Sequence, residues 1–366
     1  MKKIFRRTIL KNIIVLLIGL FSFKYIKIIQ AMEKKPYHHL EDGTFRNPPG
    51  SPERDWSNSR RSGNFFKFFY EGIVKKRIFG KKQIPDYIPD KHFISEKLAI
   101  KNFNNNKDPI SITWLGHATF LIRINETNIL TDPFLSDHAG PYLVGPKRFI
   151  KPGIRIRNLP KIDIILISHN HYDHLDTRTL SKINGKKRIK VIVPLKLKKI
   201  IEKQGYQNIY EVDWYGETEI NQIKIKSVPA IHWSRRLGQK RNETLWCGYA
   251  ITINNKKIYF SGDVAYGEVF SEIGKNIGPF DLSIVSIGAY EPREMMRTSH
   301  VTPEEAVQVT KDIKSQNILG MHWGTIRLSA EDLWEPPKRF AKTAKLQGYS
   351  EKQIWQLAIG ETKSLL

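Results

Sequence analysis

Hydrophobic and polar residues follow a regular pattern over most of this chain. From Asp108 onward, short apolar runs rich in β-branched residues end in small or polar residues, which is the pattern of buried β-strands. The predicted strands cover residues 110–124, 128–134, 162–170, 189–195, 223–233, 256–263, 281–290 and 317–324. Helical stretches separate several of these runs, so the pattern predicts layered α/β structure in which helices cover sheets.

Two of the intervening segments carry helix signals. Residues 177–185 and 303–316 are predicted to be helical. The second helix is expected to begin at Pro303, with Thr302 as its N-cap and Glu305 at the third helical position. Proline at the first position and the Thr/Glu pair of a capping box are both typical of helix starts.

The N-terminal part of the chain shows a different pattern. Basic residues in positions 1–11 precede an apolar run over 12–23, which is the order found in secretory signal peptides and signal anchors. The run is shorter than the roughly 20 apolar residues of a typical spanning helix, and an ordinary amphipathic helix is the alternative. We therefore divide the chain into a signal peptide or membrane anchor (1–35), an N-terminal extension (36–107) and the main domain (108–366).

The extension contains one unusual stretch. Aromatic residues crowd between Phe65 and Tyr70, and the basic segment Lys75–Lys82 follows shortly after. Aromatic side chains beside a cluster of cations suit a membrane interface. The alternative interpretation is a helix that packs its aromatic residues on the main domain and leaves its lysines in water.

The composition narrows the function classes without choosing one. The chain has 366 residues, 40% of them hydrophobic, and a formal net charge of +24, so it is a globular protein that is attracted to polyanions. Nucleic acid, an anionic membrane surface and a phosphorylated substrate all fit that charge. Cys247 is the only cysteine, which excludes an intramolecular disulfide and a zinc site of four cysteines.

The segment SHNHYDHLD (residues 168–176) concentrates possible metal ligands in one short turn. It follows the buried strand predicted to end near Ile167, so its side chains are expected in the loop at the carboxyl end of that strand. His169 and His171 can converge on one ion, and Asp173 and His174 can bind a second ion beside the first.

Three further candidates follow other apolar runs, because His232, Asp263 and His322 each stand where a predicted strand gives way to a loop. We therefore predict a dinuclear site. His169, His171 and His232 bind one metal ion, Asp173, His174 and His322 bind the other, and Asp263 bridges them. Two such ions hold a water molecule, lower its pKa toward neutrality and polarise a substrate oxygen, so Asp263 is also a candidate catalytic residue.

Longer motifs surround these ligands. They read TWLGHAT (113–119), LTDPF (130–134), GPKRF (145–149), LISHNHYDHLD (166–176), FSGD (260–263), IGPFDL (277–282), IGAYEPR (287–293), HVTPEEAV (300–307) and HWGT (322–325). With them, the chain resembles the N-acyl-phosphatidylethanolamine-hydrolysing phospholipase D family of the metallo-β-lactamase superfamily. The resemblance implies an α/β metallo-β-lactamase fold, the αββα sandwich, with two zinc ions held by the ligands named above. It also implies cleavage of a phosphodiester to phosphatidic acid and an N-acylethanolamine.

His300 directly precedes the helix that Thr302 is expected to cap. A helix N-terminus favours anions, so a histidine there can donate a hydrogen bond to a phosphate oxygen or to a leaving alkoxide. The resemblance also implies that His300 belongs to the active site as a catalytic residue, and a surface histidine is the alternative. Ser299 stands where the family usually has glutamine, a difference that bears on substrate preference.

Weaker candidates lie outside the predicted ligand set. Asp132 ends a strand and is expected either to orient a ligand histidine or to cap the turn at Pro133. Arg235 and Arg236 follow a predicted ligand and can hold lipid phosphates, with a solvated loop as the alternative. His117 is expected to be a structural histidine at a strand end.

The sequence therefore favours a membrane-associated zinc phosphodiesterase that acts on N-acylphosphatidylethanolamine or a related glycerophospholipid. A phospholipid substrate and an anionic membrane surface are the expected partners, with the catalytic domain on the non-cytoplasmic side. The alternatives are a dinuclear nuclease, a lactone or acyl-ester hydrolase, and a membrane protein that uses metal only for folding. No nucleic-acid-binding module is recognisable, so no specific nucleic-acid partner is expected.

Overall fold

The computed structural model describes residues 36–53, 85–141 and 144–366. The expected signal peptide or anchor and the aromatic and basic stretch Phe65–Lys82 both lie outside these described residues. Among the residues that are described, no helix is both long and apolar enough to cross a membrane.

The chain divides into two compact units, residues 1–43 and residues 44–366. In the first unit, the described residues form turns, closed by hydrogen bonds from His39 N to Pro36 O at 2.9 Å and from Gly43 N to Leu40 O at 3.1 Å. The second unit contains both sheets and also the part of the predicted extension that follows Gly43.

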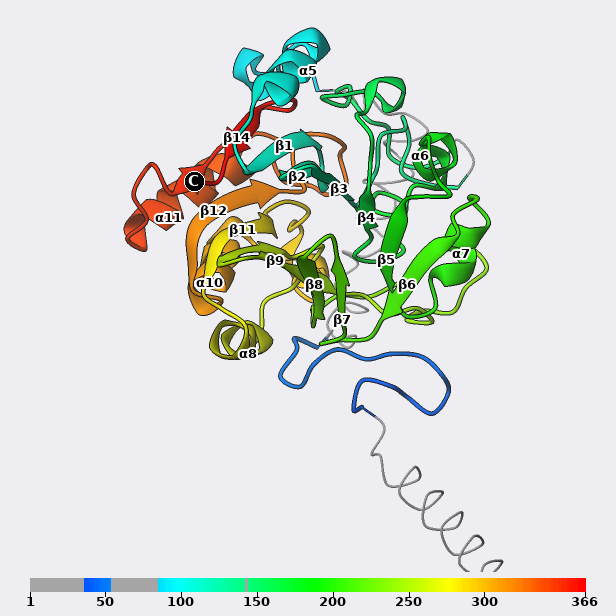
Figure 1. Cartoon of the computed structure of the whole chain (residues 1–366). Helices are drawn as coiled ribbons and strands as arrows, with labels where there is room; N and C mark the ends of the chain where they lie inside the picture. The colour runs from blue at the N-terminus through cyan, green and yellow to red at the C-terminus, as the bar shows by residue number, and fades with distance from the viewer. Residues whose placement is uncertain (1–35, 54–84, 142–143) are drawn as a thin grey trace, which may run out of the picture. The chain divides into compact units, whose positions relative to one another are not determined.

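Two sheets of seven strands each make up the centre of the second unit (Figure 1). The first sheet has the strand order β14-β1-β2-β3-β4-β5-β6. Its strands are β1 (Ile110–Gly116), β2 (Thr119–Ile124), β3 (Thr127–Thr131), β4 (Ile164–Leu166), β5 (Lys190–Pro194), β6 (Asn208–Val212) and β14 (Thr362–Ser364). The pairs from β14 to β3 are antiparallel, whereas β3, β4, β5 and β6 run parallel.

The second sheet repeats this plan, with the strand order β13-β12-β11-β10-β9-β8-β7. Its strands are β7 (Glu217–Ile220), β8 (Ile223–Val228), β9 (Gly248–Ile253), β10 (Lys256–Phe260), β11 (Phe280–Ser286), β12 (Ser315–Met321) and β13 (Ile354–Trp355). The pairs from β7 to β10 are antiparallel, and β10, β11, β12 and β13 run parallel. Each sheet is therefore half antiparallel and half parallel.

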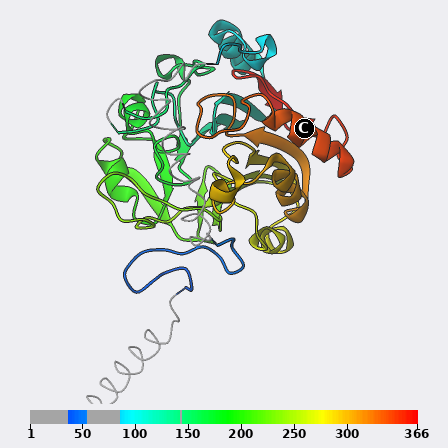
Figure 2. The ribbon, with the colours of Figure 1, turned by 180° about the vertical axis from the view of Figure 1, so that it is seen from behind.

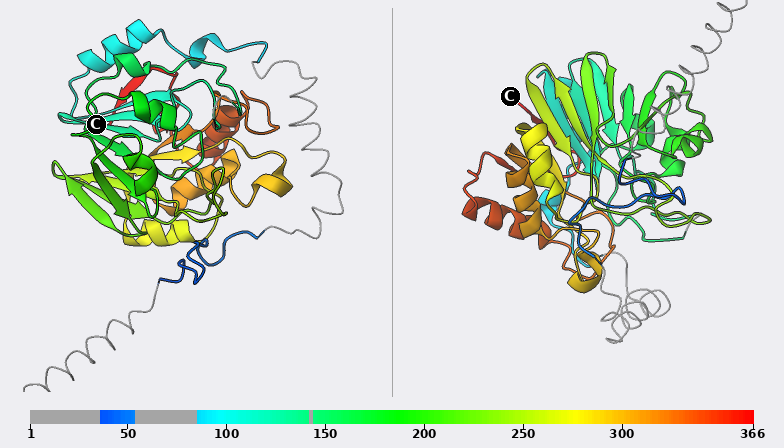
Figure 3. Two further views of the ribbon diagram at one scale, coloured as in Figure 1. Left: turned by 90° about the vertical axis from the view of Figure 1, so that its right-hand side faces the viewer. Right: turned by 90° about the horizontal axis from the view of Figure 1, so that it is seen from below.

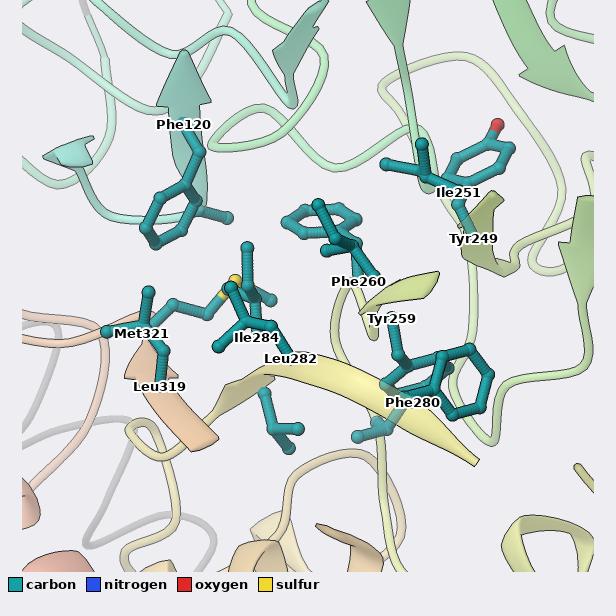
Figure 4. Packing of buried hydrophobic residues seen from close by; sticks show 14 of the residues in the cluster. Phe120, Tyr249, Ile251, Tyr259, Phe260, Phe280, Leu282, Ile284, Leu319 and Met321 are labelled. Carbon is teal, nitrogen blue, oxygen red and sulfur yellow. The ribbon is translucent and has the colours of Figure 1, made fainter. Parts of the chain in front are cut away.

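Successive side chains along the strands of the first sheet are buried alternately in two separate hydrophobic cores. In β2 and β5, Phe120 and Ile192 belong to the larger core that includes the second sheet, while Leu121, Val191 and Val193 belong to a second core. Successive side chains of a strand point to opposite faces, so a fully apolar strand serves both faces. Figure 4 shows Phe120 facing side chains of the second sheet across the larger core.

Helices cover the outer face of each sheet (Figures 2 and 3). Residues of α5 (Glu96–Asn105), α6 (Thr177–Lys182) and α7 (Lys198–Glu202) pack in the second core, against the first sheet. Residues of α8 (Val269–Asn276), α10 (Pro303–Asp312) and α11 (Pro336–Leu346) pack against the second sheet. The order helix, sheet, sheet, helix confirms the predicted αββα sandwich.

The structure also differs from the predicted elements in several places. The capping box of Thr302 and Glu305 is confirmed, but α10 ends at Asp312 because β12 begins at Ser315. The helix α5 forms inside the predicted extension, where Ser95 caps it by accepting a hydrogen bond from Leu98 N. The strands β6, β7, β9, β13 and β14 were not predicted. Of these, β6 and β7 are short and carry exposed polar residues.

Candidate metal centre

The predicted ligands follow strand ends in both sheets, and the three in the second sheet follow strands that run in the same direction. The loop with His169 to His174 follows β4 of the first sheet. In the second sheet, β8 and β10 are both antiparallel to β9, and β10, β11 and β12 are parallel, so β8, β10 and β12 share one direction. His232, Asp263 and His322 follow these three strands, and the shared direction places them at one edge of the sheet.

One cluster contains His169, His171, His232 and Asp263, whose ligand-capable atoms all lie within 4.8 Å of one another. His171 Nδ1 is 2.8 Å from His169 Nε2 and 3.2 Å from His232 Nε2. Asp263 Oδ2 lies 4.0 Å from His169 Nε2 and 3.8 Å from His232 Nε2. These are the three histidines predicted for one ion, together with the predicted bridging carboxylate.

A second cluster contains Asp173, His174 and His322, with His117 beside them. Asp173 Oδ2 is 3.4 Å from His322 Nε2 and 3.6 Å from His174 Nε2. Asp263 Oδ2 is 3.2 Å from both of these histidine nitrogens. The Asp263 carboxylate therefore lies between the two clusters, as a bridging ligand must.

The chemistry of these side chains fits divalent metal ions. Asp263 Oδ1, His174 Nε2 and His322 Nε2 are buried and have no hydrogen-bond partner among the described residues. Burying an unpaired polar atom is costly, and a bound metal ion removes that cost. Imidazole nitrogens and carboxylate oxygens are common ligands of zinc and similar ions. The ligand role of the seven residues remains a prediction.

The pKa values in the clusters also fit a site for positively charged metal ions. Burial holds the pKa of His169 and His232 well below the usual value and lowers that of His171 to about 3, so these imidazoles are neutral. Burial is the largest single influence on the pKa of His322 and would lower it, but the Asp263 and Asp173 carboxylates together outweigh burial and raise the pKa to about 9. The carboxylates therefore attract positive charge to the centre, as a proton or as a metal ion.

Asp132 lies directly behind the ligand loop, in contact with His174. Its Oδ2 accepts hydrogen bonds from His174 Nδ1 at 2.7 Å and from Ser168 Oγ at 2.6 Å. Because Ser168 Oγ donates to Asp132, it can accept from His169 Nδ1, which is 2.8 Å away. Both histidines are thus held with Nε2 free to bind a metal ion, which is the orienting role expected of Asp132.

His117 contributes more to the centre than its sequence context indicated. It does follow a strand end, as expected, but its Nε2 is 2.9 Å from Asp173 Oδ2 and its ring lies 4.0 Å from that of His322. Burial lowers the pKa of His117 to about 3, so it is neutral and donates to the carboxylate from Nε2. The motif around His117 carries no spacing signal for this contact, since the partner residues are distant in sequence.

Arg236 stabilises the ligand loop by hydrogen bonds to its backbone. Its Nη1 donates to the backbone oxygens of Asn170 and Leu175, both at 2.8 Å, and its guanidinium lies 3.9 Å from the centre of the Tyr172 ring. These contacts make it a support of the loop, whereas the sequence suggested a phosphate-binding or solvated residue. Arg235 is exposed, and its backbone N donates to Asn170 Oδ1 at 2.9 Å.

His300 lies at the same centre, with its Nδ1 3.9 Å from Asp263 Oδ2. Burial lowers its pKa to about 4, so the imidazole is neutral and can donate a hydrogen bond. The expected anion site at the start of α10 is less available, because Thr302 N and Glu305 N donate within the capping box and Pro303 has no N–H. The His300 side chain is therefore the better donor to a substrate.

Comparison with known proteins identifies the family. Residues 127–323, more than half of the chain, match the family described as "Beta-lactamase superfamily domain". The chain belongs to the metallo-β-lactamase superfamily. It is 36% identical over 265 residues to "N-acyl-phosphatidylethanolamine-hydrolyzing phospholipase D 1" of Caenorhabditis elegans, a match that covers 68% of this chain and 74% of that protein. The predicted resemblance is thereby confirmed.

Two further similarities agree with this membership in the metallo-β-lactamase superfamily. The mitochondrial "N-acyl-phosphatidylethanolamine-hydrolyzing phospholipase D" of Saccharomyces cerevisiae is 34% identical over 261 residues, covering 69% of this chain but only 56% of that protein. A solved "novel metallo hydrolase" from Ignicoccus hospitalis has a TM-score of 0.53 at 18% identity, covering 70% of this chain and 98% of that one, and shows the shared fold. The chain is a metal-dependent hydrolase of this fold.

Proposed function

We propose that this hydrolase is a zinc-dependent phosphodiesterase of the phospholipase D type. Its substrate would be N-acylphosphatidylethanolamine or a related glycerophospholipid, and its products phosphatidic acid and an N-acylethanolamine. The observation that carries the proposal is the place of Asp263. Its Oδ2 lies 3.2 to 4.0 Å from nitrogen atoms of His169, His174, His232, His300 and His322.

The two clusters divide the proposed ligands. One zinc ion would be held by His169, His171 and His232, a second by Asp173, His174 and His322, with Asp263 shared between them. When bound, two such ions polarise a phosphoryl oxygen and lower the pKa of a water molecule. Imidazoles, which are neutral when they bind a metal ion, and the carboxylates of Asp173 and Asp263 would supply the ligands for this arrangement.

The remaining residues would orient the ligand histidines and bind the substrate. Asp132 keeps the proton of His174 on Nδ1, and through Ser168 it does the same for His169. His300 would donate a hydrogen bond to a phosphoryl oxygen or to the oxygen that leaves with the N-acylethanolamine. Because its pKa is lowered to about 4, His300 acts as a neutral donor at pH 7 and not as a strong acid.

The substrate class is supported by the relatives and by the charge of the chain. The Caenorhabditis and Saccharomyces proteins carry names that specify N-acylphosphatidylethanolamine. A net charge of +24 favours an anionic membrane surface, where such lipids reside. We further propose that residues 1–35 attach the protein to that membrane, with the hydrolase domain on the non-cytoplasmic side.

Incubation of the purified, zinc-loaded protein with a mixed lipid extract tests this proposal. We expect N-acylphosphatidylethanolamine or a related phospholipid to disappear, and phosphatidic acid and an N-acylethanolamine to form. Asp263→Asn is the control, because it keeps the side-chain size but removes the shared charge. Degradation of added RNA without lipid turnover would favour the nuclease, and release of free fatty acid would favour an acyl hydrolase; either result would overturn the proposal.

A further inference from the structure

The turn that carries His300 also contacts a predicted metal ligand. His232 Nδ1 lies 2.8 Å from the backbone oxygen of the buried Ser299. Because a carbonyl oxygen only accepts, the proton of His232 is on Nδ1, and Nε2 presents its lone pair toward His171 and Asp263. His300 is the next residue along the chain. One backbone turn therefore supplies both the group that orients His232 and the candidate catalytic side chain.

The Arg293 side chain stabilises this turn by hydrogen bonds. Arg293 is the first residue of α9 (Arg293–Met296), and its Nη1 donates to His300 O at 2.6 Å. Its Nη2 donates to both carboxylate oxygens of Glu305, at 2.7 and 2.5 Å. Glu305 Oε2 in turn accepts from Thr302 N at 2.9 Å, as part of the capping box. The guanidinium therefore connects the His300 backbone to the first turn of α10.

Further contacts of the turn come from α9 itself. The backbone nitrogens of Ser299 and His300 donate to Met296 O at 2.9 and 2.8 Å. Arg293 is thus the first residue of the helix whose last residue, Met296, accepts the hydrogen bonds that close the turn. The Arg293 side chain also binds His300, the last residue of the turn. A lysine cannot reproduce this contact, because it lacks the fixed, planar set of donors of a guanidinium.

We propose that Arg293 is a positioning residue of the metal centre. Through the turn it holds the Ser299 carbonyl on His232 Nδ1 and holds His300 beside Asp263. Loss of the guanidinium would let the Ser299 carbonyl move away from His232. The proton of His232 would then no longer be held on Nδ1, and the metal ion that His232 binds would be bound more weakly. The inference rests on the proposed metal centre.

The chain offers a matched control in Arg339. Its guanidinium donates to both oxygens of Glu304, at 2.9 and 2.8 Å, from a side chain about as exposed as that of Arg293. Glu304 neighbours Glu305 on α10, but Arg339 connects α10 to α11 and not to the turn. Arg339→Lys therefore removes a similar two-point guanidinium–carboxylate contact from the same helix without touching His232 or His300.

The experiment compares Arg293→Lys, Arg339→Lys and the wild type by zinc titration against a competing chelator and by thermal unfolding of the metal-free proteins. Wild type should bind two ions. Arg293→Lys should bind one of the two about tenfold more weakly, the lower end of the effect of losing a partner that orients a metal-binding histidine. Arg339→Lys should bind both as wild type does, with a melting temperature as low as that of Arg293→Lys or lower.

The outcomes separate the inference from the proposed function. Two wild-type ions with unchanged affinities in Arg293→Lys would overturn the role of Arg293 and leave the metal centre intact. Equal weakening in both variants would also overturn it, because helix packing alone would then explain the loss. A wild type that binds no zinc would overturn the metal centre and the inference together.

Discussion

Replacing Asp132 with asparagine should weaken metal binding while leaving every proposed ligand in place. Asp132 is fully buried, and its carboxylate accepts from Ser168 N and Ser168 Oγ, both at 2.6 Å, and from His174 Nδ1 at 2.7 Å. An asparagine amide keeps one accepting oxygen and replaces the other with an NH₂ group that only donates. If that group faces His174, the histidine must accept at Nδ1 and move its proton to Nε2, the atom that faces Asp263.

The size of the effect follows from the hydrogen bond that is lost. A hydrogen bond to a charged group contributes about 1.5–3 kcal/mol, and about 1.4 kcal/mol corresponds to a factor of ten in an equilibrium constant. Losing the bond to His174 should therefore weaken metal binding by about 10- to 100-fold, which matches the range for partners of metal-binding histidines. Ser168 Oγ loses its acceptor as well, which also disturbs His169.

Zinc affinity can be measured by competition with a chelator, and the matched control is Asp176→Asn. The buried Asp176 ends the same loop and accepts from Ser136 N, Arg178 N and Thr179 Oγ1, so its loss should lower stability without altering a histidine. Wild-type affinity for both ions in Asp132→Asn would refute the reasoning. So would an equal loss of affinity in the two variants.

Three further predictions can be checked on the same protein. His300→Ala should lower turnover while elemental analysis still finds the wild-type metal content, and a loss of metal would show that His300 is a ligand or a structural residue. Cys247 is buried, and burial raises the pKa of its thiol to about 12, so a thiol reagent at pH 8 should label it only after unfolding; rapid labelling of the native protein would contradict the packing around β9. Deletion of residues 1–35 should release the protein from membranes at least partly and leave hydrolysis of dispersed substrate intact, whereas full-length protein in the soluble fraction at low salt would count against an anchor.

The apolar runs predicted layered α/β structure, and the resemblance to the family implied the αββα sandwich. The grouping of the seven candidate ligands could be predicted because it depends on where strands end. Apolar runs mark the strands, and the parallel strands of an open sheet bring their carboxyl ends to one edge. The residues after those runs, such as Asp263 and His322, could therefore be placed near one another before the fold was known. The loop from His169 to His174 added the local spacing that a metal site needs.

The contacts around the ligands could not be predicted in the same way. The partner of His232 is the backbone oxygen of Ser299, and a carbonyl group leaves no mark in the sequence. Arg236 and His117 contact residues that are distant along the chain, so neither the basic run nor the strand end indicated their partners. The helix α5 was missed because only Ala99 and Phe103 are buried in it, too few for a strong periodic signal.

The proposed reaction is tested most directly by running it in ¹⁸O-labelled water with N-acylphosphatidylethanolamine as substrate. Attack of water on phosphorus forms a new P–O bond and breaks the P–O bond to the N-acylethanolamine, whose oxygen leaves and takes up a proton. Mass spectrometry should therefore find the label in phosphatidic acid and none in the N-acylethanolamine. Label in a free fatty acid, with no labelled phosphatidic acid, would contradict the phospholipase D assignment.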